Sequence, residues 1–150
     1  EAINMAKSKG AYLAMDTYNT EYTQAEGRKN GQLEEFLKKD ADIAEIQRES
    51  FRAAVKAGAK VVYGTDSGVY PHGDNAKQFF WMVKYGMTPA EALRSATSLA
   101  AEALGKADML GRIKPGFAAD IIAVDGDPLS DVTVLENVGF VMKDGVVYKD

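Results

Sequence analysis

The sequence has 150 residues, of which 46% are hydrophobic and 27% charged, and this composition indicates a globular protein with a buried core. A net charge of -4 argues against a nucleic-acid-binding surface, and the absence of cysteine excludes disulfides, thiolate metal ligands and a cysteine nucleophile. Because no apolar run approaches the about 20 residues of a membrane span and no signal-peptide pattern is visible, we expect a cytoplasmic protein without a membrane partner.

The first half of the chain is organised around two short apolar runs, each followed by a polar loop that contains an aspartate. Residues 11–15 precede Asp16, and residues 59–63 precede Gly64-Thr65-Asp66, so we expect two buried strands at these positions. The other expected segments are a helix over residues 2–9, a polar mobile loop over residues 20–30, a short helix over residues 32–39 and a longer helix over residues 42–57. This alternation predicts an α/β fold with parallel strands.

The second half continues with helices and changes character near residue 108. Helices are expected over residues 74–85, 88–96 and 98–104, and the second of them starts with Thr88-Pro-Ala-Glu91, the pattern of a capping box with proline at the first helical position. Residues 110–116 contain turn signals around one short strand, and further short strands are expected over residues 119–124, 138–142 and 146–149. Asp144-Gly145 is typical of a type I′ hairpin turn. We therefore predict an α/β unit over residues 1–108 and a small antiparallel β unit over residues 109–150.

Asp66 is the first candidate for chemistry. Functional groups of α/β sheets and barrels lie at the carboxyl ends of strands, and Asp66 follows such an end closely. The alternative is that Asp66 is only a turn residue or a helix cap. A different hydrolase would use Ser67 as a nucleophile with Asp66 and His72, the only histidine. That hypothesis is the weaker one, because the segment lacks the Gly-x-Ser-x-Gly pattern of a nucleophile elbow.

Several motifs follow one another in order along the second half of the chain. They are Gly64-Thr-Asp-Ser-Gly68, Pro71-His-Gly73, Asn75-Ala76, Gly86-Met-Thr-Pro-Ala-Glu-Ala-Leu93, Ala96-Thr97, Leu110-Gly-Arg-Ile-Lys-Pro-Gly-Phe-Ala-Ala-Asp120 and Val141-Met-Lys-Asp-Gly-Val-Val-Tyr148. Each motif alone is a weak signal. The ordered set resembles the C-terminal part of the metal-dependent amidohydrolase superfamily, in the branch of imidazolonepropionase-like, Xaa-Pro dipeptidase-like and arginine-carboxypeptidase-like enzymes.

The resemblance implies the C-terminal portion of a (β/α)8 TIM-like barrel, with residues 11–15 and 61–63 as the seventh and eighth strands. It also implies part of a small antiparallel β domain of the composite β-sandwich type. Asp66 matches the family aspartate that touches the metal and handles the proton of the attacking water. The implied cofactor is a divalent metal, with zinc as the expected ion, and the implied reaction is hydrolysis of an amide bond. The expected substrate is a cyclic amide or a dipeptide that ends in proline or a basic residue.

The resemblance also bears on three residues near the expected active-site mouth. The family takes its metal histidines from earlier strands, so His72, in the loop after the eighth strand, is expected to line the substrate mouth or to organise the loop. Tyr18 and Tyr70 are further candidates for binding the substrate. The alternative for both tyrosines is that they are loop aromatics packed on the barrel rim.

The other metal ligands of the family have no counterpart in these 150 residues. Because a catalytic zinc site typically takes three ligands from the protein, we expect the chain alone to hold no metal stably and to be inactive. The sequence opens at Glu1 rather than at methionine, and we expect a processed or truncated product. Uncovered strand edges favour self-association, so a homo-oligomer is expected, and a non-catalytic assembly module is the alternative function.

Overall fold

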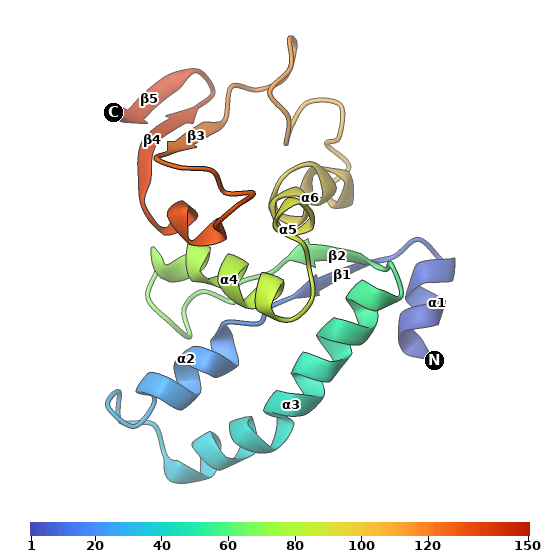
Figure 1. The fold of residues 1–150 in the computed structure, drawn as a ribbon, viewed down its shortest axis with the longest axis vertical. Coiled ribbons are helices and arrows are strands. Elements are labelled where there is room, and N and C mark those ends of the chain that lie inside the picture. Colours follow the sequence, from blue (N-terminus) through green and yellow to red (C-terminus); the bar gives the residue numbers. More distant parts are fainter.

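The computed structural model describes all of residues 1–150, in which helices and strands alternate before a small sheet ends the chain (Figure 1). The first part contains α1 (Ala2–Ser8), β1 (Tyr12–Met15), α2 (Asn19–Glu26), α3 (Glu34–Lys56), β2 (Lys60–Tyr63), α4 (Lys77–Lys84), α5 (Pro89–Ala96) and α6 (Ser98–Ala103). The second part contains β3 (Ile121–Val124), β4 (Val138–Lys143) and β5 (Val146–Lys149). Short 3-10 helices are η1 (Asp74–Ala76) and η2 (Val132–Glu136). None of the helices combines the length and the hydropathy needed to cross a membrane.

The strands β1 and β2 form a two-stranded parallel sheet, as the alternation of elements predicted. Met15 lies opposite Tyr63, so both strands end at the same edge of the sheet. Figure 1 shows α3 on one side of the two strands and the α5–α6 pair on the other. The loop that begins at Asp16 and the loop that contains Asp66 therefore leave the sheet from one common edge.

The core lies around β2, between the helices that cover it. It consists of side chains with almost no exposed surface from α3, β2, α4, α5 and the turn between α4 and α5: Phe51, Ala54, Val61, Met82, Tyr85, Met87 and Ala92. Val61 and Val62 are both buried, which confirms the expectation of a buried strand here. The same expectation was wrong for β1, whose residues are partly or fully exposed because no strand pairs with its other edge. Burying a side chain of the size of Phe51 contributes about 1.5–3 kcal/mol, so this cluster fixes β2 against α3 and α4.

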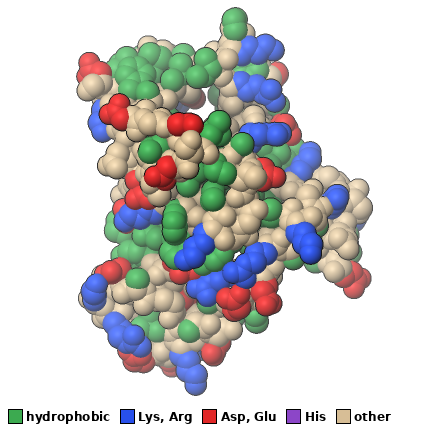
Figure 2. Space-filling view, in the orientation of Figure 1, with side chains coloured by type: hydrophobic (Ala, Val, Ile, Leu, Met, Phe, Trp, Pro, Cys, Tyr) green, Lys and Arg blue, Asp and Glu red, His purple; other side chains and the backbone are tan.

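The C-terminal strands form an antiparallel sheet in the order β3-β4-β5. Asp144 and Gly145 join β4 to β5 with positive φ angles of 50° and 78°, which confirms the predicted type I′ turn. Figure 2 shows hydrophobic side chains gathered at the end of the molecule that carries this sheet. The exposed ones on its strands are Ile122, Val146, Val147 and Tyr148. The boundary between residues 108 and 109 stays a prediction.

The segment after β1 corrects one expectation, because residues 19–26 form the helix α2 and not a mobile loop. Thr20 and Thr23 are buried, and the Thr20 hydroxyl donates to Gln47 of α3 at 2.8 Å. The Glu21 carboxylate accepts hydrogen bonds from Arg48 of α3 at 2.6 and 2.9 Å. Polar contacts with α3 thus hold α2 in place, although its sequence has no apolar stripe.

The helix α3 corrects a second expectation, because it is continuous over 23 residues and not divided near residue 40. Leu37, Ala44 and Phe51 recur every seven residues, and all three are buried on the face that α3 turns to the rest of the chain. Most charged residues between them are exposed, whereas Asp40 and Arg48 are partly buried and bind residues of α2. None of these residues interrupts the helix.

The segment before β3 is the third correction, because residues 110–116 form turns and no strand. Gly111 has a φ of 80°, and a Cβ at this position would lie 2.6 Å from the Thr97 carbonyl oxygen. The close approach of two backbones, and not strand pairing, explains the glycine here.

The capping box of α5 is confirmed. The Thr88 hydroxyl accepts from the Glu91 backbone N–H at 3.2 Å, and the Glu91 carboxylate accepts from the Thr88 backbone N–H at 2.7 Å. The two side chains satisfy each other's unpaired backbone donors, which fixes the start of α5.

Candidate functional site

Asp66 lies in the loop that leaves β2 at the carboxyl edge of the two-stranded sheet. Its side chain is exposed, and its Oδ2 accepts a hydrogen bond from Nδ2 of Asn19 at 3.1 Å. Asn19 begins α2, so the loop after β1 orients the carboxylate that follows β2. Asp66 has a φ of 48°, a left-handed conformation that Asp and Asn adopt more readily than other side chains. The structure thus presents an oriented carboxylate to solvent.

A second carboxylate, Asp16, follows β1 at the same edge. Burial raises the pKa of its carboxyl group, and the negative charges of Asp66 and Asp40 raise it further. Asp16 and Asp66 both follow strands that end at the same edge of the sheet. In the sequence each of the two aspartates follows a short apolar run, and this shared pattern indicated that both follow the end of a strand.

Gln78 of α4 joins the ends of the two strands. Its side chain has no exposed surface, and its Oε1 accepts from the backbone N–H groups of Thr17 and Tyr18 at 2.9 and 3.1 Å. Its Nε2 donates to the carbonyl oxygens of Met15, at 3.1 Å, and of Gly64. Sequence reasoning missed this residue, although a single polar residue on the buried face of an apolar helix was a signal for it.

Three tyrosines pack together beside this edge. The ring of Tyr18 lies edge-on to that of Tyr70, with centroids 4.7 Å apart, and Tyr22 lies 6.1 and 5.9 Å from these two rings. Tyr70 is only 2% exposed and Tyr18 only 9%, and burial raises the pKa of both phenols. Both rings are packed in this way, and a substrate contact by Tyr18 or by Tyr70 stays a prediction.

His72 and Ser67 are not assembled into a nucleophilic site. His72 is exposed, in the loop between β2 and α4. The Ser67 hydroxyl is buried and has no hydrogen-bond partner. A serine nucleophile needs a base within hydrogen-bond reach, and no such contact exists here. The structure therefore gives no support to the Ser67–His72 hypothesis, and a substrate contact by His72 stays a prediction.

The donor groups that a metal ion could use are sparse. No group of three or more His, Asp or Glu side chains lies close enough together to hold a metal ion. Asp66 offers one exposed carboxylate, and His72 lies further along the same loop. These residues can provide a ligand to a metal centre but do not form one by themselves.

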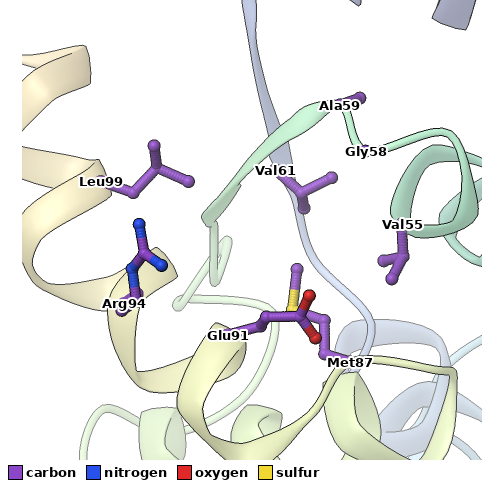
Figure 3. Close-up of a pocket in the computed structure, with 8 residues that line it drawn as sticks. All are labelled: Val55, Gly58, Ala59, Val61, Met87, Glu91, Arg94 and Leu99. Carbon is purple, nitrogen blue, oxygen red and sulfur yellow. The ribbon is translucent and has the colours of Figure 1, made fainter.

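A hollow of about 230 Å³ lies at the opposite, amino end of β2 (Figure 3). Figure 3 shows Arg94 and Leu99 on one side of it, Val55 on the other and Val61 between them. Its one carboxylate, Glu91, is engaged in the capping box of α5. The hollow thus has an apolar floor and no free acid, and it lies away from the edge that carries Asp66.

These features define an α/β protein whose carboxyl edge displays an exposed, oriented carboxylate, followed in the chain by a small antiparallel sheet. Residues 1–148 match the profile of the amidohydrolase family, and the chain belongs to this family.

Individual relatives agree with this membership. A solved Xaa-Pro dipeptidase with bound methionine in its active site is 39% identical, with a TM-score of 0.89, over 99% of this chain and 37% of that protein. The ochratoxinase of Aspergillus niger is 31% identical over 99% of this chain and 32% of its own length. The imidazolonepropionase of Geobacillus kaustophilus is 36% identical over 42% of this chain and 17% of its own length. The chain therefore spans about a third of the length of the first two.

Proposed function

We propose that residues 1–150 contribute the last two strands of a (β/α)8 barrel to a hydrolase that cleaves an amide bond in a small peptide. The parallel pairing of β1 with β2 and the helices beside them support this assignment. Barrels of this type keep their active sites at the carboxyl ends of the strands, which is where Asp66 lies. The similarity to a Xaa-Pro dipeptidase over 99% of the chain supports the reaction class.

The observation that carries the proposal is the exposed Asp66 carboxylate, held by Asn19 at the carboxyl edge. In the proposed role Asp66 accepts the proton of the attacking water and later delivers it to the leaving nitrogen. Such general base and general acid catalysis requires a carboxylate that reaches the reacting atoms, and the exposure of Asp66 meets this condition.

The family resemblance implies a divalent metal, with zinc as the proposed ion, that polarises the attacking water when it is bound. Asp66 fits the role of one carboxylate ligand. The donors of this chain do not complete a metal centre by themselves, because no cluster of three potential ligands exists here. We therefore assign no step to the metal, and the role of Asp66 is limited to holding and moving a proton.

The substrate class that we favour is a dipeptide with C-terminal proline. The similarity to the dipeptidase covers 99% of the chain, whereas that to the imidazolonepropionase covers 42%. His72, exposed in the same loop as Asp66, is proposed to line the approach to the carboxylate, together with Tyr18 and Tyr70. Dipeptides that end in arginine or lysine and cyclic amides are the other classes to be compared.

The proposal is tested by supplying the rest of the barrel. Residues 1–150 are joined to the preceding segment of the 39% identical dipeptidase, and the hydrolysis of a panel of dipeptides and cyclic amides is measured. We expect turnover of proline dipeptides, and a reduction of kcat of about 10²- to 10⁴-fold in the Asp66→Asn variant. Circular dichroism and melting temperature control for folding. A folded Asp66→Asn variant with near-normal kcat would remove Asp66 from the mechanism.

A second candidate function is that of an association module. β1 pairs only with β2, so each strand leaves one edge unpaired. Beside β1 lies a largely apolar hollow of about 510 Å³, whose lining includes Ile3, Tyr12, Leu13, Met15 and Ala54. We propose that these edges favour a homo-oligomer of the isolated chain. Native mass that stays monomeric over a wide concentration range would contradict this candidate.

A further inference from the structure

We propose that Gln78 is a positioning residue, which fixes the place of Asp66 by joining the backbone ends of β1 and β2. The inference rests on the catalytic role proposed for Asp66. Gln78 lies on α4, whose sequence Lys-Gln-Phe-Phe-Trp-Met-Val-Lys is otherwise apolar apart from its terminal lysines. A polar side chain with no exposed surface on such a helix requires partners, and Gln78 finds them in the two strand ends.

The hydrogen bonds of Gln78 continue the pairing of the strands beyond the sheet. The last backbone bond between the strands runs from the Gly64 N–H to the Met15 carbonyl oxygen, at 3.3 Å. Beyond this point the Gln78 side-chain amide bridges the two segments. Its Nε2 donates to one carbonyl oxygen of each segment, those of Met15 and Gly64. Its Oε1 accepts from the two N–H groups that follow Asp16, at 2.9 and 3.1 Å.

Only a neutral primary amide matches this set of partners. The side chain uses two N–H donors and two acceptor positions at the same time, which is the full capacity of a glutamine. A carboxylate lacks both donors, and an apolar side chain of the same length removes the hydrogen bonds to two carbonyl oxygens and two N–H groups, of which only the Met15 carbonyl oxygen keeps another donor, the Gly64 N–H. The two segments also approach each other closely at Gly64, because a Cβ at this position would lie 3.3 Å from the Met15 backbone nitrogen.

Both attachments of Asp66 depend on this bridge. Along its own chain, Asp66 is two residues from Gly64, whose carbonyl oxygen Gln78 binds. Across the edge, the Asp66 carboxylate is held by Asn19, which directly follows the Tyr18 N–H that Gln78 binds. Loss of the bridge should therefore change the relative position of Asn19 and Asp66. If Gln78 had only a structural role, its replacement would lower the stability of the chain without changing the relative position of Asn19 and Asp66.

The first test uses the 150-residue chain and needs no activity. NMR spectra of a ¹⁵N,¹³C-labelled sample report the Asn19 side-chain amide and the Asp66 carboxyl carbon in Gln78→Met and in the control Met82→Ala. Met82 lies on the same helix, has no exposed surface and belongs to the core cluster. We expect both signals to shift in Gln78→Met and to stay in place in Met82→Ala. Unchanged signals in a folded Gln78→Met chain would overturn the inference.

The second test uses the enzyme completed with the dipeptidase segment. We expect Gln78→Met to lower kcat about 10- to 100-fold with little change in KM, because a misplacement of about 1 Å carries a penalty of this order. The Met82→Ala variant should lose a comparable amount of stability but keep its kcat. Equal kcat in the two variants would assign Gln78 a structural role only.

The Gln78→Glu variant adds a pH signature and replaces Gln78→Met if that variant does not fold. A protonated glutamic acid keeps one donor, whereas the carboxylate keeps none. Its kcat relative to the unsubstituted enzyme should therefore be highest at low pH and fall as the pH rises. If kcat of Gln78→Glu followed the same pH profile as kcat of the unsubstituted enzyme, the result would count against the inference.

The failure of the proposed function can be told apart from the failure of this inference. If Asp66→Asn proves active, the proposed function fails, but the NMR test still decides whether Gln78 positions Asp66.

Discussion

The two ends of β2 differ in how their carboxylates are held. At the carboxyl end, Asp66 is oriented by Asn19 of α2, and the backbone beneath it is bound by Gln78 of α4. At the amino end, the carboxylate of Glu91 binds Thr88, only three residues away along the same chain. The carboxylate of the candidate site is thus held by residues distant in sequence, whereas the carboxylate at the amino end is held by a neighbour in sequence.

If Asp66 has the proposed role, this difference separates a part of the molecule that serves chemistry from one that serves stability. A side chain whose partners lie on other elements transmits changes in packing to the loop that carries Asp66. A capping box acts on its own helix only. The difference can be tested by substitutions at both ends and in the core between them, and the expected effects decrease in the following order.

The largest effect is expected from Phe51→Ala in the core. Phe51 has no exposed surface and packs with Val61 and Met82, so its truncation leaves a cavity between the elements that carry both ends of β2. We expect the free energy of unfolding to fall by about 3–5 kcal/mol, measured by urea denaturation. An exposed phenylalanine, Phe80, is the matched control, and Phe80→Ala should have a much smaller effect. Equal effects of the two would contradict the assigned core.

The next effect is expected from Asn19→Ala at the carboxyl end. The variant removes the side chain that donates to Asp66 Oδ2, and we expect kcat of the completed enzyme to fall about tenfold, or about 1.4 kcal/mol in activation free energy. The matched control is Arg94→Ala, which alters the hollow at the amino end of β2. Arg94→Ala should leave kcat within about twofold, and a comparable loss in both variants would remove the distinction between the two ends.

A smaller effect is expected from Thr88→Ala at the amino end. The loss of the helix cap should lower stability by about 1 kcal/mol without changing kcat.

The other half of the capping box, Glu91, should show a pH dependence. The hydrogen bond from the backbone N–H of Thr88 is the main cause of the lowered pKa of Glu91. The stabilisation by Glu91 is therefore present above its unfolded pKa and is lost as the pH falls through its folded pKa. Denaturation curves should show the difference between the unsubstituted chain and Glu91→Gln at neutral pH and lose it in acid.

The smallest effect is expected from Asp16→Asn, and its sign is opposite. The pKa of Asp16 is raised, first by burial and then by the charge of Asp66, so its ionisation opposes folding. Stability should decrease as the pH rises from the unfolded pKa through the folded pKa. Asp16→Asn should therefore slightly raise the melting temperature at neutral pH and have no such effect in strong acid. A lower melting temperature at neutral pH would show that the Asp16 carboxylate is favourably paired.

The sequence was informative wherever the determining residues lie close together along the chain. Thr88 and Glu91, and Asp144 with Gly145, specify a helix start and a hairpin turn through neighbours, and the structure confirms both. The position of Asp66 after a buried strand was also readable, because it depends on one apolar run and the loop that follows. Its role in catalysis stays a prediction.

The contacts that hold Asp66 were not readable in the same way. Gln78 binds the backbone of Thr17 and Tyr18, which are 61 and 60 residues away in sequence, and no local sequence pattern predicts such a contact. The helix α2 was missed for a related reason, since its partner Arg48 lies on α3 and its own sequence is polar. What the sequence left open is thus the set of polar contacts between distant segments.

The long sequence separation of the Gln78 contacts also has a consequence for the order of folding. Contacts between residues about 60 positions apart require the closure of a large loop, whereas α3 and α5 form from neighbouring residues. We expect the edge that carries Asp66 to assemble late, after α4 has docked onto both strand ends. Substitutions at Gln78 should then accelerate unfolding more than they slow refolding, and stopped-flow kinetics of Gln78→Met would measure this ratio.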